Sequence, residues 1–281
     1  MGLKRRQASA DQARSPASPD AFRSMTEAEA HYRRMGRLSQ MAPGELRGLL
    51  AGDPETTAPW IESAARYGVV QAQLRLGQLR LDGVGGPRDP AAALTWFRRA
   101  ADGGDPEAMN MVGRCHENGW GTPVDLSAAA EWYRLSADAG HDWGQYNYAN
   151  MLFDGRGVAR DLGEAVGGYR RAAEQGHARA MNLLARCYEE GWGVEADRAL
   201  AGQWYRRSAE GGYFRAQFNF ATLLTTRGRF DEALSWFDRA LAAATPESLR
   251  TMAEALIRHG DQRLAALGRR IGAADLTGAL P

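Results

Sequence analysis

The sequence is poor in the features that mark several classes of protein. It has only two cysteines among 281 residues, far fewer than a disulfide-stapled domain needs. No apolar run approaches the ~20 residues of a membrane-spanning helix, and no apolar stretch follows the basic N-terminal residues as it would in a secretory signal. The net charge of +1 supplies no strong field that would draw the chain to nucleic acid or to an anionic membrane. We therefore expect a folded protein with no membrane span and no nucleic-acid partner.

Motifs of catalysis and of metal or cofactor binding are also missing. The sequence has no H-E-x-x-H, C-x-x-C or G-x-S-x-G segment, and its glycine-rich turns match neither of the common phosphate-binding patterns. We predict a protein that is not an enzyme and that has no catalytic residue, cofactor or metal site. His141 and His177 share one sequence register and are expected to contact helix ends.

What the sequence does have is an internal repeat of 36 residues. A tryptophan series and a glycine series keep this step, and Gly168 stands where the tryptophan series lacks one member. The two series are Trp60, Trp96, Trp132 and Trp204, and Gly68, Gly104, Gly140, Gly176 and Gly212. A fixed period of this length indicates an array of stacked structural units.

One unit, residues 106–141, divides into two helical stretches joined by a glycine-rich turn. Small residues such as Gly113 in the first stretch allow a second helix to approach closely, and Tyr133 belongs to an apolar stripe on that second helix. Gly140 suits the left-handed position that ends the second helix, and Asp125 is expected to cap its N-terminus. Each unit is therefore predicted to be a helical hairpin.

The combination of these marks resembles the Sel1-like repeat family, which is related to tetratricopeptide repeats. The resemblance covers residues 59–244, as half a unit, four full units and a fifth unit that lacks the G-x-G turn. It implies an all-α, right-handed α-solenoid of stacked helical hairpins. A second period of 72 residues, seen in RCHENGWG and RCYEEGWG, suggests that a two-unit block was duplicated.

The ends of the chain differ from the repeats. We predict a disordered basic arm over residues 1–24, a capping helix region over 25–58 with Ser24 as N-cap, and C-terminal capping helices and a tail over 245–281. The cluster Lys4, Arg5 and Arg6 is either a solvated tail or a contact for an acidic partner.

The two cysteines lie at equivalent places two units apart. Cys115 and Cys187 are therefore too distant to form a disulfide, and reduced interior thiols fit a cytoplasmic protein. Cysteine-rich members of the family, some of them linked to penicillin binding and β-lactamase activity, carry paired cysteines that this chain lacks. A cell-wall-related binding protein or a β-lactamase-like enzyme remains the alternative function.

The resemblance implies a concave groove that binds a partner peptide or helix. By analogy with tetratricopeptide repeats, two positions in each first helix face it, and these have i, i+4 spacing. The alternative is a solvated or internally paired face. The predicted groove residues are Asn110, Arg114, Tyr146, Asn150, Asn182, Arg186, Phe218 and Thr222.

Two further predictions concern aromatic residues. Trp120 and Trp192 lie in the G-x-G turns, where they either pack on the next unit or form an exposed aromatic edge for a partner. At Gly168, the missing indole either is replaced by a neighbouring ring or leaves a pocket for an apolar side chain of the partner. The function predicted from these features is a bacterial scaffold or adaptor for protein partners, with a regulator that docks on nucleic acid as a third possibility.

Overall fold

The computed structural model describes residues 19–258 and 260–276, and this part of the chain is all α-helical. Its helices are α1 (Pro19–Leu38), α2 (Pro43–Ala51), α3 (Pro54–Arg66), α4 (Val70–Asp82), α5 (Pro90–Asp102), α6 (Pro106–Asn118), α7 (Leu126–Asp138), α8 (Asp142–Asp154), α9 (Leu162–Glu174), α10 (Ala178–Glu190), α11 (Arg198–Glu210), α12 (Phe214–Thr226), α13 (Phe230–Ala243), α14 (Pro246–Ile257) and α15 (Gln262–Leu276).

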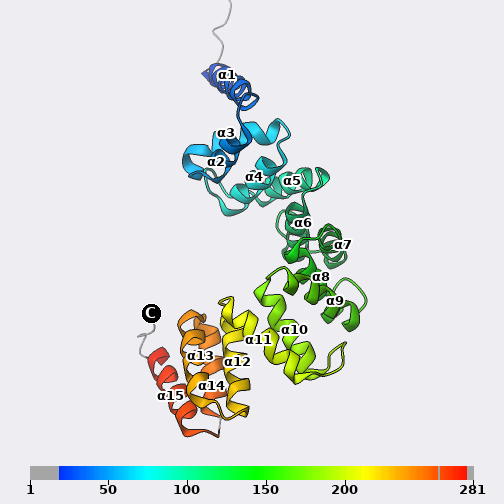
Figure 1. The fold of residues 1–281 in the computed structure, drawn as a ribbon. Coiled ribbons are helices and arrows are strands. Elements are labelled where there is room, and N and C mark those ends of the chain that lie inside the picture. The colour runs from blue at the N-terminus through cyan, green and yellow to red at the C-terminus, as the bar shows by residue number, and fades with distance from the viewer. Residues whose placement is uncertain (1–18, 259, 277–281) are drawn as a thin grey trace, which may run out of the picture.

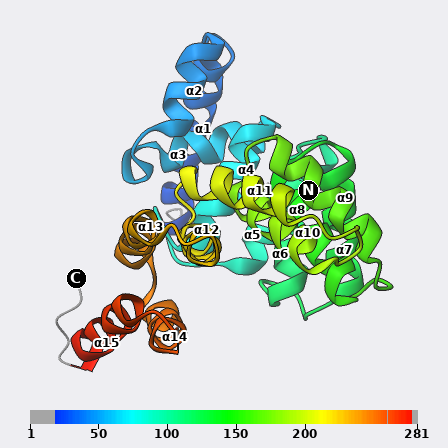
Figure 2. The same cartoon turned by 60° about the horizontal axis from the view of Figure 1, so that its bottom comes forward.

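The helices pair into hairpins that stack in chain order. Each helix from α4 to α15 packs most extensively on its hairpin partner, and the hairpins from α4 to α11 also pack on the hairpin that follows. Apolar side chains of α14 and α15 join the core cluster of α12 and α13. Figure 1 shows the hairpins following one another along the array, and in the turned view of Figure 2 helices α13–α15 lie to one side of α6–α10. The buried apolar residues of the described chain form five clusters along the array. First helices also touch each other, α6 with α8 and α10 with α12, and so line one side of the array. This architecture confirms the predicted α-solenoid.

The predicted helix caps are present in every unit that has the G-x-G turn. The side chain of Asp125 accepts a hydrogen bond from the backbone N–H of Ala128 at 2.9 Å, and Asp161 does the same for Glu164. Gly140 has a φ of +87°, the left-handed conformation expected after the second helix. Each cap satisfies backbone groups that the helix itself leaves unpaired, so it fixes where the helix begins or ends.

Within a hairpin, a ring on the second helix packs against a small residue on the first. A Cβ added at Gly113 would lie 2.7 Å from the ring of Tyr133, and Gly77 has the same relation to Phe97. Tyr133 and Phe97 are essentially fully buried. The small residues identified from the sequence therefore leave the space that the large buried rings of the second helix occupy.

The N-terminal helices cover the open side of the first half unit. Helix α1 begins at Pro19, so the prediction of an N-cap at Ser24 is wrong: that residue lies inside the helix. His31 Nδ1 lies 3.0 Å from Ser63 Oγ on α3, and the guanidinium of Arg37 lies 5.2 Å from the ring of Trp60. The predicted basic cluster, Lys4 to Arg6, lies outside the described residues.

The 72-residue period seen in the sequence recurs in the contacts. Tyr133 donates a hydrogen bond to Glu117 at 2.6 Å, and Tyr205 donates one to Glu189 at 2.7 Å. Ser136 and Ser208, both fully buried, each donate at 2.6 Å to a backbone carbonyl at the start of the first helix of their own hairpin. The same two-unit pattern of polar contacts is thus built twice.

Candidate functional site

The first helices line a concave surface that contains two adjoining clefts. The first, here called the central cleft, has a volume of 640 Å³ and is lined mainly by α6 and α8. The second, here called the C-terminal cleft, has a volume of 590 Å³ and is lined by α10, α12 and α14. Tyr146 and Arg179 line both clefts, so the two adjoin at these side chains. We refer to the two clefts together as the groove.

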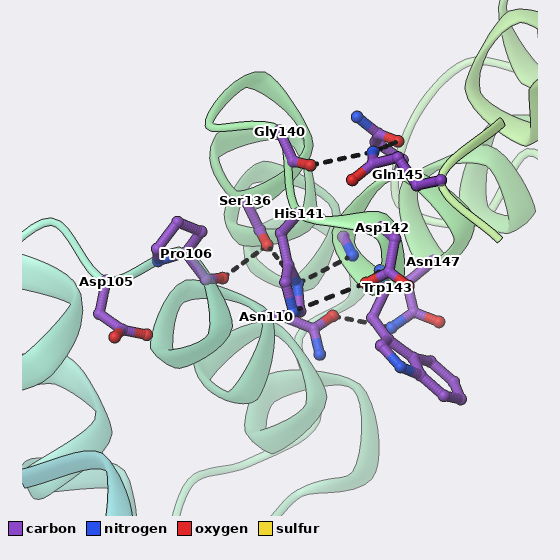
Figure 3. Close-up of polar contacts among 12 residues, drawn as sticks. Asp105, Pro106, Asn110, Ser136, Gly140, His141, Asp142, Trp143, Gln145 and Asn147 are labelled. Atoms are coloured by element: carbon purple, nitrogen blue, oxygen red, sulfur yellow. Dashed lines mark hydrogen bonds and ion pairs between the residues drawn. The ribbon is translucent and has the colours of Figure 1, made fainter. Parts of the chain in front are cut away.

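The predicted groove residues Asn110 and Asn182 are largely buried. Each is 5% exposed, and each accepts a hydrogen bond from an asparagine of the next first helix: Asn147 donates to Asn110 at 2.8 Å, and Asn219 donates to Asn182 at 2.9 Å. Figure 3 shows the pair formed by Asn110 and Asn147. These asparagines line the clefts, but their main contacts are internal, as in the internally paired alternative.

The predicted groove arginines are exposed and lie against the predicted aromatic edge. The Arg114 guanidinium is 5.1 Å from the centre of the Trp120 ring, and Arg186 is at the same distance from Trp192. Both tryptophans are half-buried. Since arginine stacks on aromatic faces while its N–H edge stays free, each pair leaves hydrogen-bond donors on the surface.

The remaining predicted positions are divided between the groove and the interior. Tyr146 and Phe218 line the C-terminal cleft. Asn150 accepts a hydrogen bond at 2.8 Å from the hydroxyl of Tyr169, and it lines a smaller, 220 Å³ cleft beside Trp192. The hydroxyl of Thr222 donates to the backbone of its own helix at 3.0 Å.

Gly168 does not open into a pocket. It is buried, and a Cβ at this position would lie 2.9 Å from Ala149 Cβ and 3.2 Å from the carbonyl oxygen of Gln145. Helix α9 therefore approaches α8 so closely that the backbone and Ala149 occupy the space. The prediction of a partner pocket there is corrected by this close helix contact.

Sequence reasoning missed four residues that line the groove. Arg179 and Arg215 line the C-terminal cleft, and Trp143 and Glu107 line the central cleft. The signal was present, because these four residues share one register of the 36-residue repeat at the start of each first helix. The contribution of α14, which lies beyond the repeats, had no such signal.

The wall between the clefts is organised around His177. Its ring stacks on Tyr146 at 4.7 Å and meets the edge of Trp143 at 4.5 Å, and its Nδ1 accepts the backbone N–H of Ala180 at 3.1 Å. Burial lowers the pKa of His177, and the neighbouring Arg179 lowers it further, against an opposing effect of Asp142. The ring is therefore neutral at pH 7 and acts as the N-cap of α10. This confirms the predicted contact with a helix end.

This arrangement predicts a pH-dependent stability. In the unfolded chain His177 has an ordinary pKa near 6.5, whereas in the folded chain its pKa is lower, so protons bind preferentially to the unfolded state. The free energy of unfolding should fall as the pH drops below about 6.5. The variant His177→Asn keeps a capping acceptor without a titrating ring. Urea denaturation between pH 7.5 and 5 should show a shallower decline for this variant, and parallel curves for the two proteins would contradict the assignment.

The two cysteines are buried and free. Burial raises the pKa of Cys115 and of Cys187 to about 11. A thiol with so high a pKa carries little thiolate at neutral pH, and the thiolate is the reactive form. These residues serve as small core side chains of the first helices.

Comparison with known families identifies the repeat. The family model described as the Sel1 repeat matches residues 70–105, 106–141, 144–177 and 178–213, which is just over half of the chain. These matches correspond to the four hairpins from α4 to α11. No curated protein matches the sequence.

Solved structures give similar solenoids. The protective antigen c5321 of uropathogenic Escherichia coli, which displays an SLR fold, is 27% identical with a TM-score of 0.70, and the alignment covers 89% of this chain but only 56% of the antigen. A Sel1 repeat protein from Oxalobacter formigenes is 25% identical with a TM-score of 0.69, over 81% of this chain and 96% of the other.

Within the described residues, no helix is both long and apolar enough to cross a bilayer.

Proposed function

Because this chain belongs to the Sel1 repeat family, whose solenoids generally serve as protein-interaction scaffolds, we propose that it is a non-enzymatic adaptor whose groove binds a segment of a partner protein. Stacked hairpins present a long concave surface without any dedicated motif, and such surfaces hold extended peptides or helices. The two free, buried cysteines support a location in the reducing cytoplasm.

The observation that carries this proposal is the junction of the two clefts. Tyr146 and Arg179 belong to both, so a bound segment can run from α6 to α14 without leaving the surface. The exposed residues along this path combine aromatic rings with arginines, and these residue types are enriched at sites that contribute strongly to protein binding.

A blocking variant tests the groove directly. Ala255 is an exposed residue of α14 that lines the C-terminal cleft, so Ala255→Trp fills the cleft without removing any contact of the fold. Ala242→Trp, at an exposed position of α13 that lines neither cleft, is the matched control.

The measurement is affinity capture from the native cell with the wild-type protein and both variants. Proteins recovered with the wild type and with Ala242→Trp, but lost with Ala255→Trp, are the partners that occupy the groove. Recovery of the same proteins by both variants would refute the proposal.

A further inference from the structure

The C-terminal cleft holds three arginines with no ion-pair partner. Arg179, Arg186 and Arg215 line it together with a single acidic residue, Glu247. In the described part of the chain none of the three arginines forms an ion pair, whereas Arg134 on α7 pairs with two carboxylates. Exposed arginines that converge on one cleft without internal counter-charges leave a positive surface for an anionic group.

These arginines are held in place by aromatic rings. The guanidinium of Arg179 lies 5.4 Å from the ring centre of Trp143, that of Arg186 lies 5.1 Å from Trp192, and that of Arg215 lies 5.8 Å from Phe214. Stacking engages the flat face of a guanidinium and leaves its N–H edge free for carboxylate oxygens. A side chain that is already positioned loses less conformational entropy when it binds a ligand.

The spacing of the arginines fits several charges on an extended chain. Arg179 and Arg186 are seven residues apart on α10, which corresponds to two helical turns and about 10 Å along the axis. An extended peptide in the polyproline II conformation has three residues per turn and advances about 3.1 Å per residue, so side chains three residues apart lie on one face and span a similar distance of about 9 Å. Arg215 on the neighbouring α12 adds a third positive group beside them.

The cleft also offers apolar contacts between these charges. Leu183, Phe218 and Met252 line it, and the three come from α10, α12 and α14 respectively. We infer that the C-terminal cleft binds an extended acidic segment of a partner protein, in which carboxylates about three residues apart contact Arg179, Arg186 and Arg215 and apolar side chains lie between them. This inference rests on the proposed function and specifies the chemistry of its ligand.

A defined peptide probe tests the charge requirement. The probe is a fluorescein-labelled nonapeptide with three repeats of Ala-Glu-Leu, and its neutral counterpart has Gln in place of each Glu. By fluorescence anisotropy, the acidic peptide should bind about tenfold or more tightly than the neutral one, and added salt should weaken the binding. Equal affinities for the two peptides would overturn the inference. Tighter binding of a labelled nine-nucleotide oligothymidylate would overturn it in favour of a single-stranded nucleic acid.

Charge-matched variants locate the site. The triple variant Arg179→Gln, Arg186→Gln, Arg215→Gln should reduce acidic-peptide affinity about tenfold or more. The control replaces three exposed arginines outside both clefts, Arg47, Arg171 and Arg198, by Gln, and it should bind the peptide almost as well as the wild type. An equal loss in both triple variants would show that only net charge matters and would contradict the assignment.

The same variants separate this inference from the proposed function. If the cellular partner is lost with Ala255→Trp but retained by the cleft triple variant, the groove binds a partner whose recognition is not acidic, and the inference alone fails. If neither variant loses a partner, the proposed function fails with it. If the partner is lost with Ala255→Trp and with the cleft triple variant, but retained by the two control variants, both the proposed function and the inference are supported.

Discussion

Replacing Gly157 by alanine is expected to lower the free energy of unfolding by about 2–5 kcal/mol. Gly157 has a φ of +69°, a left-handed conformation that costs any other residue about 1–2 kcal/mol. An added Cβ would also overlap the carbonyl group of Leu126 and lie 2.8 Å from the backbone nitrogen of Ser127. Because this obstacle is backbone at the start of α7, it cannot move aside as a side chain would, and overpacking of this kind costs about 1–3 kcal/mol more.

The matched control for this prediction is Gly140→Ala. Gly140 has a similar φ of +87°, but a Cβ there would have no other atom within 4 Å. Only the conformational cost of about 1–2 kcal/mol should remain. Urea denaturation followed by circular dichroism measures both variants. If the two substitutions cost the same, the second glycine of the G-x-G turn has no special role in joining neighbouring hairpins.

The second large effect is expected at Tyr133. Its ring is 1% exposed and packs on Gly113, so Tyr133→Ala should lower the free energy of unfolding by about 3–5 kcal/mol through the cavity it leaves. Its hydroxyl donates a hydrogen bond at 2.6 Å to Glu117, which also pairs with Arg156 at 3.0 Å.

The comparison with Tyr133→Phe separates ring packing from hydrogen bonding. The phenylalanine keeps the ring and removes only the hydroxyl, while Glu117 keeps its partner Arg156, so the loss should be about 1 kcal/mol. Denaturant midpoints and slopes of the two variants give both values. If Tyr133→Phe lowered the free energy of unfolding as much as Tyr133→Ala, the hydrogen bond to Glu117, and not the packing of the ring on Gly113, would stabilise the hairpin.

Much of the candidate site could be predicted because repeat registers identify equivalent positions. The register of Arg114 and Arg186 led to two exposed arginines beside the tryptophans of the turns, and the register of Tyr146 and Phe218 led to the C-terminal cleft. The same reasoning placed Asn110 on the groove but could not show that its side chain already accepts a hydrogen bond from Asn147. A register gives the position of a residue within its own unit, but it does not give the side chain of the next unit that contacts this residue.

Within the repeats, the sequence by itself determined the helices, their ends and the pairing within each hairpin. Capping aspartates, left-handed glycines and the alternation of small and large apolar residues act over a few residues or one hairpin, so they can be read along the chain. Only the tertiary structure decided that Gly168 is closed by α8, that His177 holds the wall between the clefts, and that α14 completes the groove. These features depend on how far each unit is rotated against the next, and that rotation results from packing between side chains distant in the sequence.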